Sequence, residues 1–391
     1  MNQTRPKQEE VLSRQVAEIL PTKKGLETLM EKRKIRLYLG IDPTGGNLHL
    51  GHTIALKKLQ QFADLGHETI LVVGTGTVLA GDPSQRDKAR PKITKAEIKR
   101  NMRTWRLQAG KVLNFSKVKI RENGDWLLKL GLADIVEIAS HISAVQLFQR
   151  DIFRRRTQRG DTVWTHETLY PLLQGYDSVA LDVDLEIGGT DQVFNMLIGR
   201  ELLHKMKYKE KFVLTVPMIP GLDGKTMSKT SGNTVNIADP AKEMYGKLMT
   251  LRDELVPQYF ELLTDVFKEE IQSMKKSLSP RDFKARLARE ITAIYQGAKK
   301  AGAAEKEFVK VFQKKQLPSN VKDVKGLRGS RSLVECLVQA KLAASKSEAR
   351  RLIQQGGVKV DGEVQRSESS LIELRFGSVI QVGKRKFIRI A

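Results

Sequence analysis

Apolar residues recur along the chain at two spacings, which predict its strands and its helices. Short runs rich in leucine, isoleucine and valine end at turn residues, as is typical of buried strands. Between these runs, apolar residues three and four positions apart predict amphipathic helices. The predicted strands are 36–41, 69–74, 179–185 and 212–216, and the predicted helices are 11–20, 24–31, 51–65, 95–112 and 190–206.

The alternation of strands and helices predicts an α/β fold over residues 35–232, after a helical segment at 1–34. Strands that alternate with helices form a mainly parallel, doubly wound sheet with helices on both faces. Residues at about 115–165 interrupt the alternation, because they are helical and basic. We interpret them as a helical insertion between the two halves of the sheet.

The pattern changes after residue 232. Residues 233–315 have a helical spacing almost throughout, with predicted helices at 241–251, 255–263, 281–296 and 303–313. Residues 316–330 are polar and contain a proline and two glycines, which predicts a linker. The last piece, 331–391, is predicted to be a small α+β domain, with two helices followed by strands at 358–360, 379–382 and 387–390.

The charge of the chain indicates the kind of partner. Its 391 residues include 68 Lys and Arg against 45 Asp and Glu, a net charge of +23. A protein this basic is typical of those that bind polyanions, because cations that neutralise phosphates release condensed counterions. Aromatic residues make up only 6%, which favours contact with the backbone of a folded RNA or a duplex over stacking on single-stranded bases.

Other features of the composition exclude several classes of protein. No apolar run approaches the roughly 18–20 residues that cross a membrane, and the first 20 residues resemble neither a signal peptide nor a transit peptide. The single cysteine, Cys336, excludes a disulfide framework and a cysteine-based zinc site. We therefore expect a soluble, cytoplasmic protein that binds nucleic acid.

Residues 38–52, YLGIDPTGGNLHLGH, are the most informative segment. A strand end runs into a turn, and His49 and His52 then open a helix, whose unpaired N–H groups suit a phosphate. The two imidazoles can donate hydrogen bonds to phosphate oxygens whose charge grows in a transition state, and Gly51 lets an adenine base approach the backbone. Taken alone, two such histidines favour a helix cap or a metal site, but this context favours phosphate.

A second segment, residues 224–231, reads GKTMSKTS and follows the last predicted strand. Its lysines, Lys225 and Lys229, could reach phosphates from the side opposite the histidines. By itself, such a loop of lysines and small hydroxyl residues is usually only solvated. Together with the first segment it becomes a specific signal.

With both segments in view, the chain resembles the class I aminoacyl-tRNA synthetases, and most closely the tyrosyl-tRNA synthetases of bacterial type. The resemblance covers nearly the whole chain. Besides the two segments above, it rests on GDPS at 81–84, YPLLQGYD at 170–177 and GGTDQ at 188–192. SKSEARRLI at 345–353 and GVKVDG at 357–362 resemble an S4 RNA-binding domain.

The resemblance implies a tyrosine–tRNA ligase, which activates L-tyrosine with ATP and transfers the tyrosyl group to the 3′ end of tRNA(Tyr). It implies a Rossmann-like catalytic domain over 35–232, a helical tRNA-binding domain over 233–315 and an S4-like domain over 331–391. Mg²⁺ is expected to arrive with ATP, without a metal site of the protein or a tightly bound cofactor. A homodimer is implied too, with the insertion at about 115–165 near its interface.

The resemblance also implies roles for individual residues. The catalytic group is His49, His52, Lys229 and Thr44, and the ATP-binding group is Gly40, Asp42, Gly51, Gly189, Asp191, Met227, Ser228 and Lys229. The tyrosine-binding group is Tyr38, Asp82, Tyr170, Gln174, Asp177 and Gln192, with Tyr38 and Asp177 on the phenol. The tRNA-binding group is Arg154, Arg155, Lys346, Arg350 and Arg351.

One position departs from the family pattern. The first lysine of the family's second signature falls on Thr226, and Lys225 lies one residue earlier. Activation could therefore rest on Lys229, or Lys225 could take over the missing role.

Two other functions stay open. One is a tryptophanyl-tRNA synthetase, which the S4-like tail and the Tyr38–Asp177 pair disfavour. The other is a non-catalytic RNA-binding protein, which only Thr226 favours.

Overall fold

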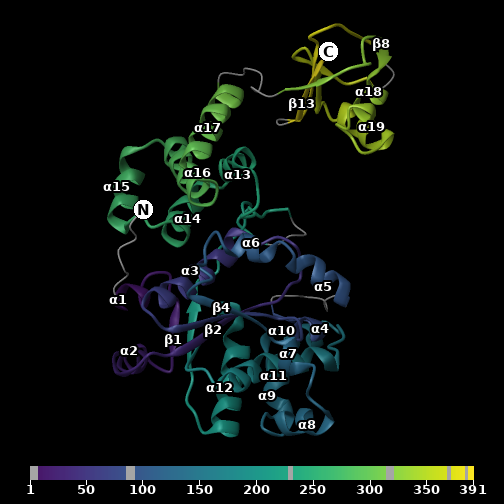
Figure 1. Cartoon of the computed structure of the whole chain (residues 1–391). Coiled ribbons are helices and arrows are strands. Elements are labelled where there is room, and N and C mark those ends of the chain that lie inside the picture. Colours follow the sequence, from purple (N-terminus) through teal and green to yellow (C-terminus); the bar gives the residue numbers. More distant parts are fainter. Residues whose placement is uncertain (1–7, 85–92, 228–231, 314–320, 368–370, 384–385) are drawn as a thin grey trace. The chain divides into compact units, whose positions relative to one another are not determined.

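The computed structural model divides into two compact units, Met1–Gly302 and Ala303–Ala391, with the boundary inside helix α17 (Ala298–Phe308) (Figure 1). Within the described residues, no helix is both long and apolar enough to cross a membrane. The structure describes all residues except 1–7, 85–92, 228–231, 314–320, 368–370 and 384–385.

A six-stranded sheet in the order β1-β6-β5-β2-β3-β4 forms the centre of the first unit. All neighbours in this sheet pair in parallel except β1, which pairs antiparallel with β6. The predicted doubly wound α/β fold is therefore confirmed, with one antiparallel edge strand. The strands are β1 (Glu18–Leu20), β2 (Arg36–Ile41), β3 (Glu68–Val73), β4 (Val118–Glu122), β5 (Leu185–Gly189) and β6 (Phe212–Val216).

The central strand β2 is buried on both faces of the sheet. Leu37, Tyr38 and Leu39 are each at most 3% exposed, as expected for a strand that helices cover on both sides. Tyr38 lies opposite Ile70 of β3 and Glu186 of β5. This register brings the carboxyl ends of β2, β3 and β5 to one edge, where open α/β sheets bind their ligands.

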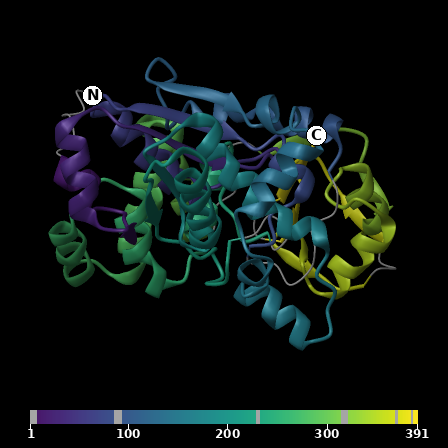
Figure 2. The ribbon, with the colours of Figure 1, turned by 90° about the horizontal axis from the view of Figure 1, so that it is seen from below.

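Helices cover both faces of this sheet. Helix α3 lies against one face, and α11 and α12 lie against the other (Figure 1), while α1 and α2 lie at one end of the unit and α7–α10 at the other (Figure 2). The helices up to the last strand are α1 (Gln8–Val11), α2 (Lys23–Lys32), α3 (Leu50–Asp64), α4 (Thr77–Ala80), α5 (Lys95–Met102), α6 (Trp105–Ala109), α7 (Gly124–Leu127), α8 (Leu132–Ser140), α9 (Ala144–Phe148), α10 (Asp151–Gln158), α11 (Thr165–Leu181), the 3₁₀ turn η1 (Thr190–Gln192) and α12 (Val193–Lys207).

Two predicted elements are wrong. Residues 11–20 are not a helix, because α1 ends at Val11 and the chain then enters the short strand β1. Residues 179–185 are not a strand, because α11 continues to Leu181 and the strand at this place is β5. Val179 and Leu181 are buried on the helix, and a short buried apolar run does not distinguish a helix from a strand.

The insertion predicted at about 115–165 begins later than expected. Its first part is the edge strand β4, which pairs in parallel with β3. Of its five residues only Val118 is buried, and the sequence VKIRE alternates apolar and polar residues over only four positions, which is the shortest alternation that indicates a half-buried strand. The helices α7–α10 follow it, as the helical interpretation predicts.

The helical region after β6 belongs largely to the same compact unit as the sheet, whereas the sequence predicts a separate domain over 233–315. Tyr259 donates a hydrogen bond to the Pro220 carbonyl, and Gln296 donates to the carbonyls of Ile237 and Asp239. The pattern missed α15. The elements are α13 (Ala241–Leu248), the 3₁₀ turn η2 (Asp253–Leu255), α14 (Val256–Leu263), α15 (Lys268–Ser277), α16 (Pro280–Gln296), α17 and the π-helical turn η3 (Val309–Gln313).

The second unit has its own apolar core beneath a five-stranded sheet in the order β10-β9-β12-β13-β7, with a separate β8–β11 pair. The strand β7 pairs in parallel with β13, so this sheet begins inside the segment predicted as a linker. Its elements are β7 (Lys322–Val324), β8 (Gly329–Ser332), α18 (Leu333–Gln339), α19 (Lys346–Gln354), β9 (Val358–Val360), β10 (Glu363–Gln365), β11 (Leu371–Leu374), β12 (Val379–Val382) and β13 (Lys386–Ile390).

A buried lysine joins the N-terminal segment to α3. The side chain of Lys58 has no exposed surface, and its Nζ donates to the carbonyls of Val11 and Arg14, at 2.7 Å each. Arg14 in turn donates to the carbonyls of Thr264 and Val266, just after α14. Burial lowers the pKa of Lys58 to about 7.

This pKa predicts a specific dependence of stability on pH. Between about pH 7 and about pH 10, Lys58 binds a proton in the unfolded chain but not in the folded one, so the folded state gains stability as the pH rises. Relative to the Lys58→Met variant, the wild-type free energy of unfolding should rise across this range by at most about 1.4 kcal/mol per pH unit. Urea unfolding of both proteins at several pH values measures it, and a constant difference would contradict the assignment.

Candidate active site

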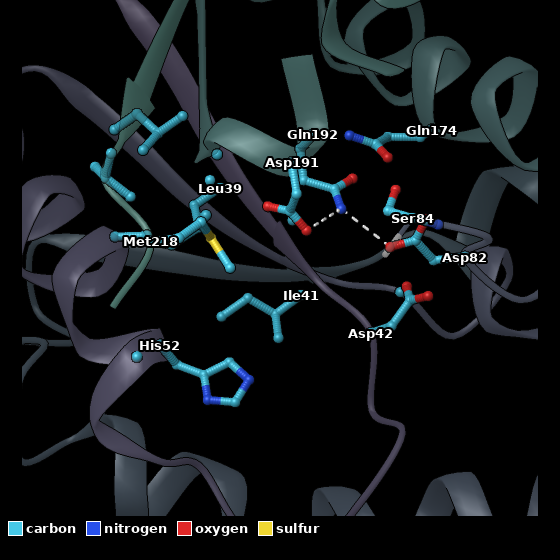
Figure 3. A pocket seen from close by; sticks show the side chains of 18 of the residues that line it. Leu39, Ile41, Asp42, His52, Asp82, Ser84, Gln174, Asp191, Gln192 and Met218 are labelled. Atoms are coloured by element: carbon cyan, nitrogen blue, oxygen red, sulfur yellow. Dashed lines mark hydrogen bonds between the residues drawn. The ribbon is translucent and has the colours of Figure 1, made fainter. Parts of the chain in front are cut away.

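A cavity of about 680 Å³ opens at the carboxyl ends of β2, β3 and β5 in the first unit. Figure 3 shows His52, Met218 and Leu39 on one side of it, Asp82, Ser84 and Gln174 on the other, and Ile41 between them. The predicted site residues that line this cavity are Gly40, Asp42, Thr44, His49, Gly51, His52, Asp82, Tyr170, Gln174, Asp177, Gly189, Asp191, Gln192 and Met227.

The two histidines stand at the N-terminus of α3. The backbone N–H of His49 donates to Nδ1 of His52 at 3.1 Å, and the ring centroids are 3.8 Å apart. Because Nδ1 of His52 accepts this bond, the neutral ring carries its proton on Nε2, which is then a donor. A Cβ at Gly51 would lie 3.1 Å from the ring of His49, so the glycine also makes room for that ring.

Asp42 is fixed by two hydroxyl groups at the end of β2. Its Oδ1 accepts from Thr77 at 2.8 Å, and its Oδ2 accepts from the Tyr170 hydroxyl at 3.1 Å. The carboxylate lies directly against Gly74, where an added Cβ would be 1.9 Å from Oδ1. Only glycine therefore fits at the end of β3 while Asp42 keeps this position.

A second group of acceptors lies across the cavity from His52 (Figure 3). Asp82 accepts from the backbone N–H of Ser84 at 2.9 Å and from Nε2 of Gln192 at 3.0 Å. Gln192 also donates to Asp191 at 3.1 Å. Burial, with Asp82 nearby, raises the pKa of Asp191. Even with the buried Arg150 nearby, two acidic side chains favour a ligand that carries a positive charge.

Asn195, which the sequence analysis did not select, fixes the orientation of two glutamines. Its side chain has no exposed surface, and Nδ2 donates to Oε1 of Gln192 at 2.8 Å and to Oε1 of Gln174 at 3.0 Å. Nε2 of Gln174 donates to Glu186 at 3.0 Å. Each glutamine therefore turns its oxygen towards Asn195, which sets the polarity of this side of the cavity.

The two residues expected to bind a phenol occupy different layers. Asp177 lines the cavity and accepts hydrogen bonds from Trp126 at 2.8 Å and Asn123 at 3.1 Å. Burial raises its pKa well above the usual range of a carboxyl. Tyr38 lies behind the lining residues, with no exposed surface, and its hydroxyl is 3.1 Å from Ser178 Oγ. The structure thus brings Asp177, but not Tyr38, to the cavity surface.

The second signature segment is described only in part. Thr226 and Met227 line the cavity, whereas Ser228 and Lys229 lie outside the described residues. Lys225 is exposed and is not among the lining residues. Asn233 supports the base of the segment by donating to Asp223 at 2.8 Å and to the Thr226 carbonyl at 3.1 Å.

The predicted tRNA-binding residues are on helix surfaces. In the first unit, Arg154 and Arg155 are exposed on α10 and line a shallow depression. In the second unit, Lys346, Arg350 and Arg351 are exposed on α19, and Nζ of Lys346 is 3.1 Å from a Glu335 carboxylate oxygen. Each group stays a prediction.

The family is decided by comparison with known proteins. The family "tRNA synthetases class I (W and Y)" matches residues 30–313, and the S4 domain family matches residues 331–378. The chain belongs to the class I tRNA synthetases. Its relatives include the tyrosine–tRNA ligases of Thermotoga maritima, 42% identical over 99% of this chain and 98% of that protein, and of Moorella thermoacetica, 43% identical over 97% and 94%.

Solved structures show the same fold at lower identity. A truncated mitochondrial tyrosyl-tRNA synthetase of Aspergillus nidulans superposes with a TM-score of 0.65, at 20% identity, over 76% of this chain and 91% of that one. The tyrosyl-tRNA synthetase of Archaeoglobus fulgidus, complexed with L-tyrosine, gives 0.62 at 22% identity, over 75% and 98%. The expected fold is thereby confirmed, and the family matches above confirm the class I synthetase and the S4 domain.

Several residues of this synthetase site were not found from the sequence. From the sequence, Arg150 is only one of the basic residues of the insertion. In the structure it is 8% exposed and donates to Ser84 Oγ, beside Asp82. For two of these residues the sequence offers an indication, because Glu186 and Asn195 lie within three residues of the GGTDQ segment. Within the described part of the chain, no cluster of three or more His, Cys, Asp or Glu could hold a metal ion. The missed residues are Asn123, Trp126, Arg150, Ser178, Glu186, Asn195 and Lys211.

The contact between Gly74 and Asp42 gives a test of the site's packing. Gly74→Ala should lower the free energy of unfolding by about 1–3 kcal/mol, because the methyl group must displace the carboxylate and Thr77. The control is Gly302→Ala in α17, where an added Cβ meets nothing within 4 Å and should stabilise the helix by up to about 1 kcal/mol. Urea unfolding measures both; equal effects would contradict the tight fit at Gly74.

Proposed function

We propose that this chain is a tyrosine–tRNA ligase, which forms tyrosyl-adenylate from L-tyrosine and ATP and then transfers the tyrosyl group to tRNA(Tyr). The observation that carries the proposal is that one cavity is lined both by His49 and His52 and by Asp82, Asp177 and Gln192. The first pair suits phosphates, and the second group suits an ammonium and a phenol. The relatives named tyrosine–tRNA ligase support the same amino acid.

In the activation step, the tyrosine carboxylate attacks the α-phosphorus of ATP and pyrophosphate leaves. The substrate supplies its own nucleophile, so catalysis consists of positioning and of stabilising the charge on the phosphates. Nε2 of His52 and the N-terminus of α3 supply donors on one side of the cavity. We assign Thr44 and Lys229 as further phosphate contacts, and the backbone at Gly40, Gly51 and Gly189 as the nucleoside surface.

On the tyrosine side, we assign the ammonium to Asp82, Gln174 and Tyr170. Their oxygen atoms can accept hydrogen bonds from an ammonium group, and Gln192 fixes the Asp82 carboxylate. We assign the phenol to Asp177, with the Tyr38 hydroxyl supporting it from the layer behind. A polar group built to meet the phenol rejects phenylalanine, because it is left buried and unpaired. A site that discriminates in this way needs no separate editing step.

ATP brings the metal ion in this proposal. Mg²⁺ keeps most of its waters and binds through substrate phosphates, so we treat MgATP as the substrate and assign no tightly bound cofactor.

We also place the protein in the cytoplasm, where a reduced thiol persists. Cys336, which is free and buried in the second unit, suits that compartment.

Pyrophosphate exchange with each of the twenty amino acids tests the function. Exchange with tyrosine alone is the expected result. Exchange with tryptophan would identify the other amino acid of this family, and no exchange at all would identify a non-catalytic RNA-binding protein.

The phosphate assignment predicts the effect of removing His52. His52→Ala should slow adenylate formation about 10²–10³-fold and leave tyrosine affinity nearly unchanged, because the lost donor acts mainly in the transition state. Stopped-flow fluorescence measures the rate. His204→Ala is the control, since His204 is exposed on α12 and pairs with Glu210. Equal rates in both variants would refute the role of His52.

The assignment of tRNA contacts to the second unit predicts the effect of a truncation. A chain that ends at residue 320 loses the whole five-stranded sheet, including β7, and keeps every lining residue of the cavity. It should retain tyrosine-dependent exchange but lose most tRNA charging. Loss of exchange on truncation would mean that the second unit supports the catalytic one.

Arg350→Ala and Arg351→Ala should each reduce the slope of log affinity for tRNA against log salt by about one unit.

We also propose a homodimer that forms through α8, α9 and the segment before α11. Large apolar side chains are exposed there: Leu132 is 81% exposed, Val136 59%, Val145 66%, Phe148 51% and Trp164 55%. Exposed apolar side chains that gather on one surface mark interaction sites.

Charge placed on this surface should disrupt the dimer. Val136→Lys is expected to give a monomer in light scattering, because a buried unpaired charge opposes association. Leu107→Lys on α6, where the leucine is 78% exposed, is the matched control and should remain dimeric. A dimeric Val136→Lys protein would place the interface elsewhere.

A further inference from the structure

Lys211 is a completely buried lysine that the mechanism above does not use. Its side chain has no exposed surface, and it lies one residue before β6. Nζ donates to the carboxylate of Glu186 on β5 and, at 2.8 Å, to Ser178 Oγ on α11. Both partners are buried as well, with Glu186 1% and Ser178 0% exposed. Burial lowers the pKa of Lys211, and the adjoining Glu186 carboxylate opposes that shift. The amino group is therefore held between the sheet and α11, behind the cavity.

Through Glu186, the lysine controls the orientation of a side chain that we assign to the substrate ammonium. One carboxylate oxygen of Glu186 accepts from Lys211 and the other accepts from Nε2 of Gln174, at 3.0 Å. An ionised carboxylate can only accept hydrogen bonds. Gln174 must therefore present its NH₂ group to Glu186, and its oxygen faces Asn195 instead. A neutral partner at position 186 would remove this constraint and leave Asn195 as the remaining group that orients the amide.

Through Ser178, the same lysine reaches the residue that we place behind the phenol. An ammonium group has donors only, so Ser178 Oγ accepts from Lys211. The Ser178 hydroxyl is also 3.1 Å from the Tyr38 hydroxyl, and Tyr38 packs among Ile70, Val72 and Val183. Lys211 thus fixes Glu186, the partner of Gln174, and Ser178, the partner of Tyr38. Gln174 is assigned to the ammonium end of the substrate tyrosine, and Tyr38 to its phenol end.

We propose that Lys211 is a positioning residue for tyrosine recognition, which acts by keeping Glu186 an obligatory acceptor and by orienting the hydroxyls of Ser178 and Tyr38. The proposal rests on the proposed function. Stability alone does not account for this ion pair, because a well-packed apolar pair can replace a buried ion pair without loss of stability. What an apolar pair cannot do is accept a hydrogen bond from the Gln174 amide and so reinforce the orientation that Asn195 favours.

The test compares Lys211→Met with the double variant Lys211→Met/Glu186→Gln. The single variant leaves a buried carboxylate unpaired, so we expect a lower melting temperature and a KM for tyrosine at least about tenfold higher, with the KM for ATP nearly unchanged. The double variant leaves no unpaired charge and should regain thermal stability. Its KM for tyrosine should stay high, because a neutral amide at position 186 can also donate hydrogen bonds and is no longer an obligatory acceptor for the NH₂ group of Gln174.

Two further variants complete the experiment. Lys209→Met is the matched control, since Lys209 pairs with Asp182 and Asp184 away from the cavity, and its KM for tyrosine should equal that of the wild type. Ser178→Ala breaks only the branch to Tyr38 and should lower the ratio of kcat/KM for tyrosine over phenylalanine by several-fold, up to about tenfold.

The outcomes separate the role of Lys211 from the function itself. Recovery of the KM for tyrosine together with stability in the double variant would show a merely structural lysine and overturn the proposal. An unchanged KM for tyrosine in folded Lys211→Met protein would overturn it too. Failure of the wild type to exchange pyrophosphate with tyrosine would instead overturn the proposed function.

Discussion

The parallel pairing of β2 with β3 and β5 is the constraint on which the site depends. It places Tyr38 beside Ile70 and Glu186, and it brings three strand ends to one edge of the sheet. A shift of one residue would turn each strand's side chains to the opposite face. Asp42, Gly74 and Gly189 then would not meet around one cavity. The chemistry assigned to the site is thus a consequence of register in a sheet whose central strand is buried on both sides.

The electrostatics of the cavity oppose those of the chain as a whole. The protein carries a net charge of +23, yet its cavity is lined by five carboxyl groups, those of Asp42, Asp82, Asp177, Glu186 and Asp191, and burial raises the pKa of Asp177 and of Asp191. Hydrogen-bond donors meet each of them, including Thr77, Trp126, Gln192 and Lys211. Acceptors that are fixed in this way need no reorganisation when a cationic group enters. The basic charge lies mainly outside the cavity, where a polyanion can meet it.

The sequence predicted the elements whose local pattern agrees with their burial. The bounds of β2 and β6 agree with the structure, and α3 agrees to within one residue, because their apolar residues are contiguous or regularly spaced. The edge strand β4 was missed because its apolar–polar alternation spans only four residues and adjoins a helical, basic segment. Site residues in contiguous motifs, such as His49 and His52, were found because the residues that identify each motif are neighbours in the sequence. Asn195 and Lys211 were not, because they bond to partners 21 and 33 residues away along the chain and each is a common residue type. Such residues become visible only when the fold closes the distance.

The edge of the sheet has a consequence for the order of synthesis. The strand β1 pairs Glu18 with Thr215 and Leu20 with Val213, so one of the first segments to leave the ribosome has its partner near residue 215. At roughly 5–20 residues per second, it waits on the order of 10–40 seconds. Meanwhile β2, β3 and β4 can pair as they emerge, and β5 adds to the other side of β2. The strand order therefore allows the sheet to grow outwards from its middle during translation, whereas β1, which is made first, cannot pair before β6 has been made.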